Sequence, residues 1–305
     1  LAAAGIGTLK PLDADKHDGA FEPPIKWQRD FPTGEDAACP MVVGRYFRGV
    51  KNGPSPQWVQ ERLKAIGLRP ISALVDITNL VTFDLCRPLH VFDADKLAGD
   101  LTMRFARDGE KILALDGKEY TLEDGMNVIA DAKGVHAIGG IMGGENTGCT
   151  EETTNVFLEV ALFDPIRTAT TGRKLGIESD ARYRFERGLD PESVYWGAEV
   201  ATRLVLAFCG GEASELTVAG EMPEWARPVS LRPERLKSFG GVDVASDEAV
   251  DILTRLGFEP KVENGVIHGT TPSWRADVET EYCLVEEVLR AVSYTHLRAH
   301  ETKQD

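Results

Sequence analysis

Several features are missing from this sequence, and each absence narrows the class of protein. No apolar run approaches the roughly 18 residues of a membrane-spanning helix, so we expect no membrane contact. The first residues carry neither an initiator Met nor the basic lead of a signal peptide, so we expect an internal fragment of a longer chain. No Gly-x-Ser-x-Gly elbow occurs, which speaks against Ser/His/Asp nucleophilic catalysis.

Cysteine is also scarce. The five cysteines form no Cys-x-x-Cys spacing, which excludes zinc and redox sites of that type. Their odd number and wide separation predict reduced thiols and a cytoplasmic location.

Positive charge is in short supply. The net charge is −15 and the pI about 4.9, which excludes wrapping of nucleic acid without regard to sequence. One basic stretch could still contact RNA, or it could be a solvated surface whose charges pair with each other. It contains Arg167, Arg173, Lys174, Arg182, Arg184 and Arg187.

The length of 305 residues favours two or three domains. Proline and charge are frequent in residues 1–40, which predicts an irregular connector. A helix is expected over residues 57–66, with Trp58, Leu63 and Ile66 facing inward. The remaining pattern predicts strands or hairpins over 41–50, 101–106, 111–115, 126–130, 135–138 and 155–162, and a helix ending near 209.

A composition break at residues 221–228 predicts a linker. The compact unit after it is expected to contain a strand over residues 229–231 and a helix over residues 247–256, capped by Ser246. An Asn264-Gly265 hairpin turn and a helix over residues 278–292 complete this unit.

Residues 71–97 carry a polar cluster inside an apolar segment. Asp76, Thr78 and Asn79 precede an Arg87-Pro88 turn, and His90 stands between two apolar residues. Burying such groups is costly unless each finds a partner, so the cluster indicates a site. His90 taken alone is more often a satisfied core or loop histidine, and a metal site with Asp93 and Asp95 lacks a second histidine.

Two further features are ambiguous on physical grounds. The glycine cluster at residues 139–148 reads as a turn rather than a dinucleotide fingerprint, because no helix begins on it. Paired glycines do allow a substrate close to bare backbone. Glu159, inside an apolar strand, is either an exposed edge residue or a carboxylate on the floor of a pocket.

An acidic set lies near the end of the chain. Asp277, Glu286 and Glu287 could hold a hard divalent cation through oxygen ligands. The simpler interpretation makes Asp277 a helix N-cap and the glutamates a solvated face, with an apolar stripe formed by Leu284, Val285, Val288, Leu289 and Val292.

Long motifs in this chain resemble the beta subunit of bacterial phenylalanyl-tRNA synthetase. The resemblance runs from about Pro40 to Val292 and is carried by GPSPQWVQERLKAIGLRPISALVDITNLV, RPLHVFDADKL, AIGGIMGGENTGC, FLEVALFDP, SDARYRFERGLDP and PSWRADVETEYCLVEEV. It implies an α+β or α/β multidomain chain. An editing domain of mixed sheets and helices (41–220) would precede a small α+β, winged-helix-like module (229–292). Residues 1–40 would connect to a missing N-terminal tRNA-binding region.

The resemblance also implies an activity. Family members attach phenylalanine to tRNA(Phe) with ATP, as a heterotetramer of two alpha and two beta subunits, and the synthetic site belongs to alpha. The region matched here would hydrolyse mischarged Tyr-tRNA(Phe). In that family a glutamate reads the tyrosine hydroxyl, and Glu159 matches it. The threonine and histidine that place the terminal adenosine and the water match Thr78 and His90. Asn79, Gly139 and Gly140 match substrate-binding positions.

Two departures from the family pattern stand out. Family carboxylates that bind Mg²⁺ match Asp277, Glu286 and Glu287, but Cys283 replaces a fourth, and a thiol is a poor magnesium ligand. Residues 293–305 do not follow the family and are expected to be an aberrant, disordered tail. The alternative function is a scaffold that binds tRNA or the alpha subunit and has lost editing. A stand-alone metal-dependent hydrolase is a third possibility.

Overall fold

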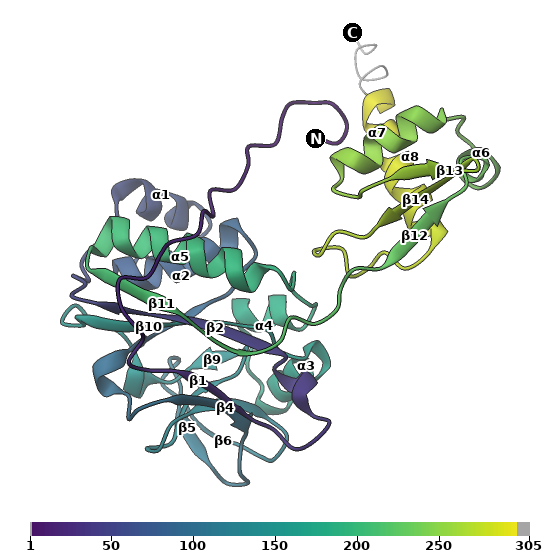
Figure 1. Ribbon diagram of the computed structural model, residues 1–305. Coiled ribbons are helices and arrows are strands. Elements are labelled where there is room, and N and C mark those ends of the chain that lie inside the picture. Colours follow the sequence, from purple (N-terminus) through teal and green to yellow (C-terminus); the bar gives the residue numbers. More distant parts are fainter. Residues whose placement is uncertain (1, 298–305) are drawn as a thin grey trace. The chain divides into compact units, whose positions relative to one another are not determined.

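The computed structural model describes residues 2–297, which divide into two compact units (Figure 1). One unit contains Asp13–Pro223. The other contains the residues from Glu224 onward together with the first twelve. The boundary falls within the expected linker, residues 221–228. No helix among the described residues is long and apolar enough to cross a membrane.

The first unit is built on two sheets. The four-stranded sheet is antiparallel and has the order β11-β2-β10-β3. The five-stranded sheet has the order β1-β4-β7-β8-β9, in which only β1 and β4 are parallel. Its strands are β1 (Trp27–Asp30), β4 (Leu101–Phe105), β7 (Asn127–Ala130), β8 (Val135–Ile138) and β9 (Met142–Gly143); those of the other sheet are β2 (Met41–Arg48), β3 (His90–Asp93), β10 (Asn155–Ala161) and β11 (Glu212–Gly220).

The four-stranded sheet lies between two layers. Helices cover one of its faces, and the five-stranded sheet lies on the other side (Figure 1). The helices of this unit are α1 (Gln57–Ala65), α2 (Ala73–Asp84), α3 (Pro165–Leu175), α4 (Asp180–Phe185) and α5 (Ser193–Cys209). A separate hairpin pairs β5 (Lys111–Leu113) with β6 (Glu119–Thr121), as the Asp116-Gly117 turn predicts. Short 3₁₀ turns occupy Asp36–Ala38, Ala94–Lys96 and Glu145–Thr147.

Strand β10 is buried on both faces, and this positions the site. Val156, Leu158 and Val160 pack into the core beneath the helices. Phe157 and Ala161 point the other way, into the core between the two sheets. Since side chains alternate along a strand, Glu159 shares the face of Phe157 and Ala161 and lies between the sheets.

Most predicted elements of the first unit are confirmed, and two expectations for this unit are wrong. The connector is not wholly irregular, because Trp27 is buried between the sheets and β1 pairs with β4. In α1 the inward residues are Val59 and Leu63, one helical turn apart, whereas Trp58 and Ile66 are exposed.

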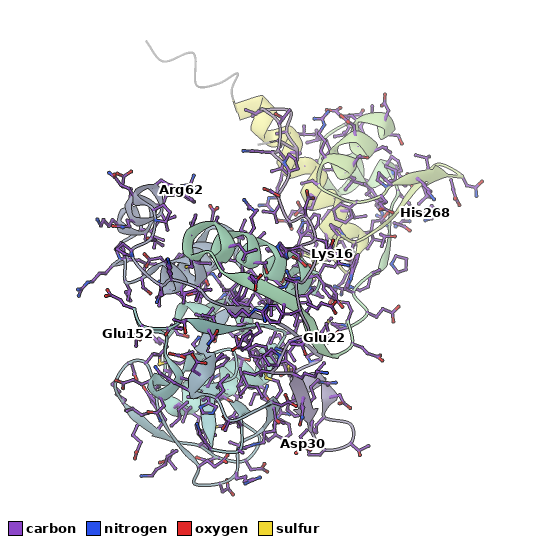
Figure 2. All side chains as sticks on the ribbon, turned by 60° about the vertical axis from the view of Figure 1, so that its left-hand side comes forward. Lys16, Glu22, Asp30, Arg62, Glu152 and His268 are labelled. Atoms are coloured by element: carbon purple, nitrogen blue, oxygen red, sulfur yellow. The ribbon has the colours of Figure 1, made fainter. Side chains whose placement is uncertain are left out.

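Charged side chains such as Arg62 and Glu152 extend outward from this unit (Figure 2).

The second unit is a small α+β module. Its sheet has the order β12-β14-β13, and a hydrophobic core joins the sheet to three helices. Asn264 and Gly265 both have positive φ, as the predicted two-residue hairpin turn requires. The elements are β12 (Pro228–Leu231), α6 (Glu234–Gly240), α7 (Ser246–Arg255), β13 (Lys261–Glu263), β14 (Val266–Thr270) and α8 (Glu281–Leu297).

Three details of this unit differ from the sequence prediction. Ser246 is the first residue of α7 and makes no capping hydrogen bond. Helix α8 begins at Glu281, four residues after Asp277, and the Asp277 carboxylate accepts hydrogen bonds from Arg275. It also continues through residue 297, into the segment expected to be a disordered tail, and the rest of that tail lies outside the described residues.

Candidate functional site

Adjacent strands bring His90 and Glu159 together. Strands β3 and β10 are antiparallel, and the Cα atoms of His90 and Glu159 are register partners. Residues that face each other in such a pair have Cβ atoms about 5 Å apart. Two residues separated by 69 positions therefore reach one place in the fold, as the sequence prediction required.

A cavity of about 370 Å³ lies at this place. Its polar lining includes His90, Glu159, Asp116 and Ser179, and bare backbone is supplied by Gly140 and Gly143. The remaining lining is mostly apolar and includes Pro88, Leu89, Leu115, Ile129, Ala137, Ile138, Ile141, Met142, Ala181 and Phe185. A small, largely apolar cavity with a few convergent polar groups is typical of a ligand site.

Two of the polar residues that line the cavity each have one atom without a hydrogen-bond partner. Glu159 Oε1 and His90 Nε2 are buried and have no hydrogen-bond partner. Each such group costs about 1–3 kcal/mol if it stays unpaired, so an unpaired buried atom in a native fold asks for an explanation. A ligand that hydrogen-bonds to them would remove that cost.

Burial moves the pKa values of these two groups in opposite directions. Desolvation raises the pKa of Glu159 to about 7, although the positive charge of Arg87 opposes the rise. Desolvation lowers the pKa of His90 to about 4. At neutral pH the imidazole is therefore uncharged, and the carboxyl group is divided between its two forms.

The glycines fit the site in different ways. Gly140 lines the cavity with φ +69°, and a Cβ there would meet Phe163 at 2.9 Å. Gly139 does not line the cavity among the described residues; a Cβ there would press on Phe163 at 2.7 Å. Gly143 touches the site more directly, because its Cβ would lie 2.4 Å from Cε1 of His90.

Thr78 and Asn79 stand apart from this cavity. Both lie on α2, and neither belongs to the cavity lining among the described residues. The Thr78 hydroxyl donates to the Val75 carbonyl, 2.7 Å away. Asp76 accepts hydrogen bonds from the Ser55 hydroxyl and the Ile71 N–H, at 2.5 and 2.8 Å, and so stabilises the start of α2. The polar cluster that first indicated a site is thus partly structural.

The expected magnesium set is not assembled. Among residues 2–292, whose side chains the structure describes, there is no group of three or more His, Cys, Asp or Glu side chains placed to hold a metal ion. Arg275 lies 2.8 Å from Asp277 and 3.0 Å from Glu287, while Glu286 is exposed. Because a guanidinium neutralises two of the three carboxylates, this arrangement does not fit a divalent cation.

The basic stretch is largely paired with acids. Its ion pairs are Arg167–Glu35, Lys174–Glu123, Arg182–Glu186, Arg184–Asp180 and Arg187–Glu186. This favours the interpretation of a solvated, paired surface over an RNA-binding patch.

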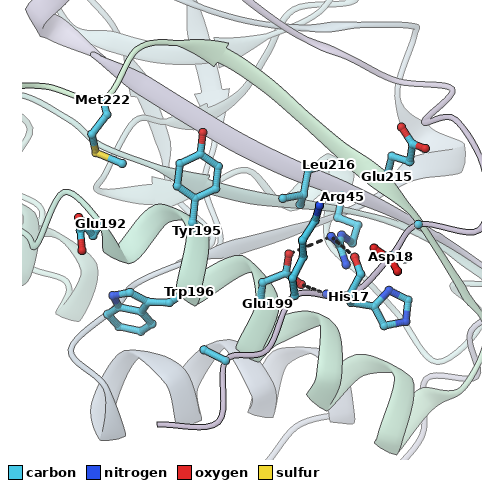
Figure 3. A pocket seen from close by; sticks show the side chains of 13 residues that line it. His17, Asp18, Arg45, Glu192, Tyr195, Trp196, Glu199, Glu215, Leu216 and Met222 are labelled. Carbon is cyan, nitrogen blue, oxygen red and sulfur yellow. Dashed lines mark hydrogen bonds and ion pairs between the residues drawn. The ribbon is translucent and has the colours of Figure 1, made fainter. Parts of the chain in front are cut away.

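A larger cavity lies elsewhere in the same unit (Figure 3). Its volume is about 1160 Å³, and none of the predicted site residues lines it. Arg45 Nη2 lies 3.1 Å from Glu199 Oε1 and donates to the His17 carbonyl, while the His17 N–H donates to Glu199 (Figure 3). These inner charged groups pair with each other and fasten the segment around His17, so we assign them a structural role.

Two residues of the site escaped sequence reasoning. Ser179 lines the cavity and donates to the Ile141 carbonyl, but a serine before a helix reads as an N-cap, which it also is. Arg87 is fully buried behind the cavity, although an Arg-Pro pair is typical of an exposed turn. The signal for Arg87 was its position three residues before His90.

Comparisons with known proteins identify the family of the chain. The profile of the B3/4 domain family matches residues 38–210, and that of the tRNA synthetase B5 domain matches residues 229–294. The phenylalanine–tRNA ligase beta subunit of Paramagnetospirillum magneticum is 55% identical over 299 residues, 98% of this chain and 38% of that protein. The corresponding subunit of Brucella abortus is 56% identical over 95% of this chain and 36% of its own length. The chain thus spans less than two fifths of these relatives.

Among solved structures, an N-terminal fragment of the phenylalanyl-tRNA synthetase beta subunit from Pyrococcus horikoshii is similar, with a TM-score of 0.43 and 16% identity. The match covers 91% of this chain and 78% of that one.

Proposed function

The chain belongs to the family of phenylalanine–tRNA ligase beta subunits, and we propose that its first unit hydrolyses tyrosine wrongly attached to tRNA(Phe). The observation that carries this proposal is the buried Glu159 Oε1, which has no hydrogen-bond partner and belongs to a residue lining a mostly apolar cavity of about 370 Å³. A cavity of this kind suits one aromatic side chain with a hydroxyl at its far end.

Glu159 supplies the specificity in this proposal. A site that synthesises Phe-tRNA cannot strongly reject a side chain that merely adds a hydroxyl, whereas a site that needs the hydroxyl can reject phenylalanine. A tyrosine hydroxyl would donate to Glu159 Oε1 and satisfy it. Phenylalanine would leave the buried Glu159 Oε1 unpaired, at a cost of about 1–3 kcal/mol.

His90 would position the attacking water rather than act as a strong base. With a pKa of about 4, the imidazole is neutral at pH 7 and is a weak proton acceptor. An aminoacyl ester is already activated, so a well-placed water suffices for hydrolysis. Gly140 would let the substrate approach the backbone closely. Gly139, which has no Cβ, would leave room for the Phe163 ring that packs against it. Thr78 and Asn79 lie on α2, which packs against β3, and would hold the terminal adenosine.

The wider assignment follows the family. We propose that the chain works in a cytoplasmic ligase that attaches phenylalanine to tRNA(Phe) with ATP and Mg²⁺. Its partners would be the alpha subunit, in a heterotetramer of two alpha and two beta subunits, and the tRNA. Synthesis would take place outside this chain, and Asp277, Glu286 and Glu287 carry no step here.

A deacylation assay tests the proposal. Preformed Tyr-tRNA(Phe) is mixed with the chain, alone and with added alpha subunit, and hydrolysis is followed at pH 7. We expect Glu159→Ala, which removes the acceptor, to slow hydrolysis about 5- to 150-fold, the equivalent of about 1–3 kcal/mol. The exposed Glu151→Ala is the matched control and should leave the rate unchanged.

Two results would contradict the assignment. Equal rates for the wild type and Glu159→Ala would remove Glu159 from the site. Strongly salt-dependent tRNA binding without any hydrolysis would instead favour the scaffold function.

A further inference from the structure

Arg87 is a buried cation that no step of the proposed reaction uses. Its side chain is fully buried, 0% exposed, and follows Cys86, whose φ of +57° turns the chain sharply after α2. Leaving an arginine inside a protein is expensive unless an opposite charge compensates it. A fold that keeps Arg87 here needs it for a reason beyond packing.

The hydrogen bonds of Arg87 tie it to the strand that carries Glu159. Nη2 donates to the Ala161 carbonyl at 2.5 Å, and Ala161 is two residues beyond Glu159 on the same face of β10. The guanidinium also lies 5.8 Å from the ring of Phe185, which lines the cavity. Arg87 therefore sits directly behind the cavity floor.

Two of the three guanidinium nitrogens of Arg87 are not hydrogen-bonded. Nε and Nη1 have no hydrogen-bond partner, and Glu159 Oε1, on the neighbouring strand, has none either. No ion pair within 4 Å joins the two side chains in the described part of the chain, and Arg87 Nη2 donates to the Ala161 carbonyl instead. Their attraction acts through space, where a poorly polarisable interior keeps it strong.

Other charged groups near this pair are few. The Cys39 thiol is neutral, because burial raises its pKa. His90 is neutral because burial lowers its pKa to about 4, and Asp190 is the second carboxylate that acts on Arg87. Arg87 is the cation that opposes the effect of burial on Glu159.

We infer that Arg87 is a positioning residue for the cavity: its buried positive charge favours the ionised form of the Glu159 carboxyl, and this form accepts a hydrogen bond from the substrate's hydroxyl. The inference rests on the proposed function. It adds that selection for tyrosine depends on pH and that Arg87 sets the pH at which selection begins.

The test uses two probes that resist hydrolysis, 3′-deoxyadenosine carrying tyrosine or phenylalanine through a 3′-amide. The ratio of their affinities for the chain is measured from pH 6 to pH 9. In the wild type the preference for the tyrosyl probe should rise with pH through about 7, as Glu159 ionises.

Arg87→Met removes the charge, and the rise should move to higher pH by at least one unit. At pH 7 the preference should then fall at least about fivefold, because a one-unit shift lowers the ionised fraction from about one half to about one eleventh, and it should recover towards pH 9. Arg87→Gln, which is also neutral but keeps a donor for the Ala161 carbonyl, should behave alike and covers the case in which the Met variant does not fold. Arg87→Lys keeps the charge and should stay close to the wild type.

The outcomes separate the two proposals. An unchanged midpoint in Arg87→Gln, or a preference lowered equally at every pH, overturns the role of Arg87 and leaves the proposed function intact. A wild type that shows no preference for the tyrosyl probe at any pH overturns the proposed function and this inference with it.

Discussion

Replacing Gly143 with alanine should disable hydrolysis without unfolding the protein. A Cβ at this position would lie 2.4 Å from His90 Cε1 and 2.8 Å from His90 Nε2. Ordinary contacts begin at 3.4 Å, so one of the two groups has to move by about 1 Å, the difference between 3.4 and 2.4 Å. The φ of Gly143 is not positive, so alanine introduces no backbone strain of its own.

The imidazole is the group that can move. Gly143 lies in β9, which is hydrogen-bonded to β8, whereas His90 projects its ring beside Phe92. A displacement of about 1 Å in a group that positions a reactant lowers a rate by about 100-fold. If the ring stays and the backbone yields, the expected cost is about 1–3 kcal/mol of stability.

The assay combines hydrolysis of Tyr-tRNA(Phe) at pH 7 with urea unfolding. Gly53→Ala is the matched control, because a Cβ there meets nothing within 4 Å and its φ is also not positive. We expect the control to keep the wild-type rate. A Gly143→Ala variant with both the wild-type rate and the wild-type stability would refute the idea that this contact fixes the ring.

Two further predictions concern stability. Asp76→Ala should lower the free energy of unfolding by about 1–3 kcal/mol in urea, because Ser55 and Ile71 lose their buried acceptor; an unchanged midpoint would contradict this. The second concerns the dependence of stability on pH. Between pH 4 and 6.5 His90 is neutral in the folded state and protonated in the unfolded state, so its contribution to stability rises with pH. Between pH 4.5 and 7 Glu159 is protonated in the folded state and ionised in the unfolded state, so its contribution to stability falls with pH. Compared with the wild type, Glu159→Gln should therefore gain stability from pH 4.5 to 6.5 and His90→Gln should lose it; parallel curves for all three proteins would count against the shifts.

Local patterns predicted most strands, because alternation and turn residues are written into short stretches. The Asp116-Gly117 and Asn264-Gly265 turns each lie between paired strands. Strand β1 was missed for the opposite reason. Its four residues, Trp27–Asp30, show no run of apolar residues, and its partner β4 lies more than seventy positions away. Pairing over such a distance leaves no local signal.

For the candidate site, too, the sequence revealed some residues and not others. A charged residue inside an apolar strand is visible in the sequence, and Glu159 does lie at the cavity. A buried polar group that serves a helix start leaves the same trace, so Asp76 could not be told from a ligand-binding residue. The Arg87-Pro88 pair was interpreted as a turn, and the burial of Arg87 could not be foreseen, because its acceptor, the Ala161 carbonyl, is 74 positions away.

Glu159 remains the residue that the fold by itself explains least. It is the one charged residue in β10, a strand buried against helices on one face and against a second sheet on the other. Stability would be served by an apolar side chain here, since burial penalises the ionised carboxyl and its Oε1 has no partner. Arg87 adds a second buried charge that is not fully paired. Proteins keep such costly groups where function needs them, and a buried carboxyl with an unused acceptor is what recognition of a hydroxyl requires.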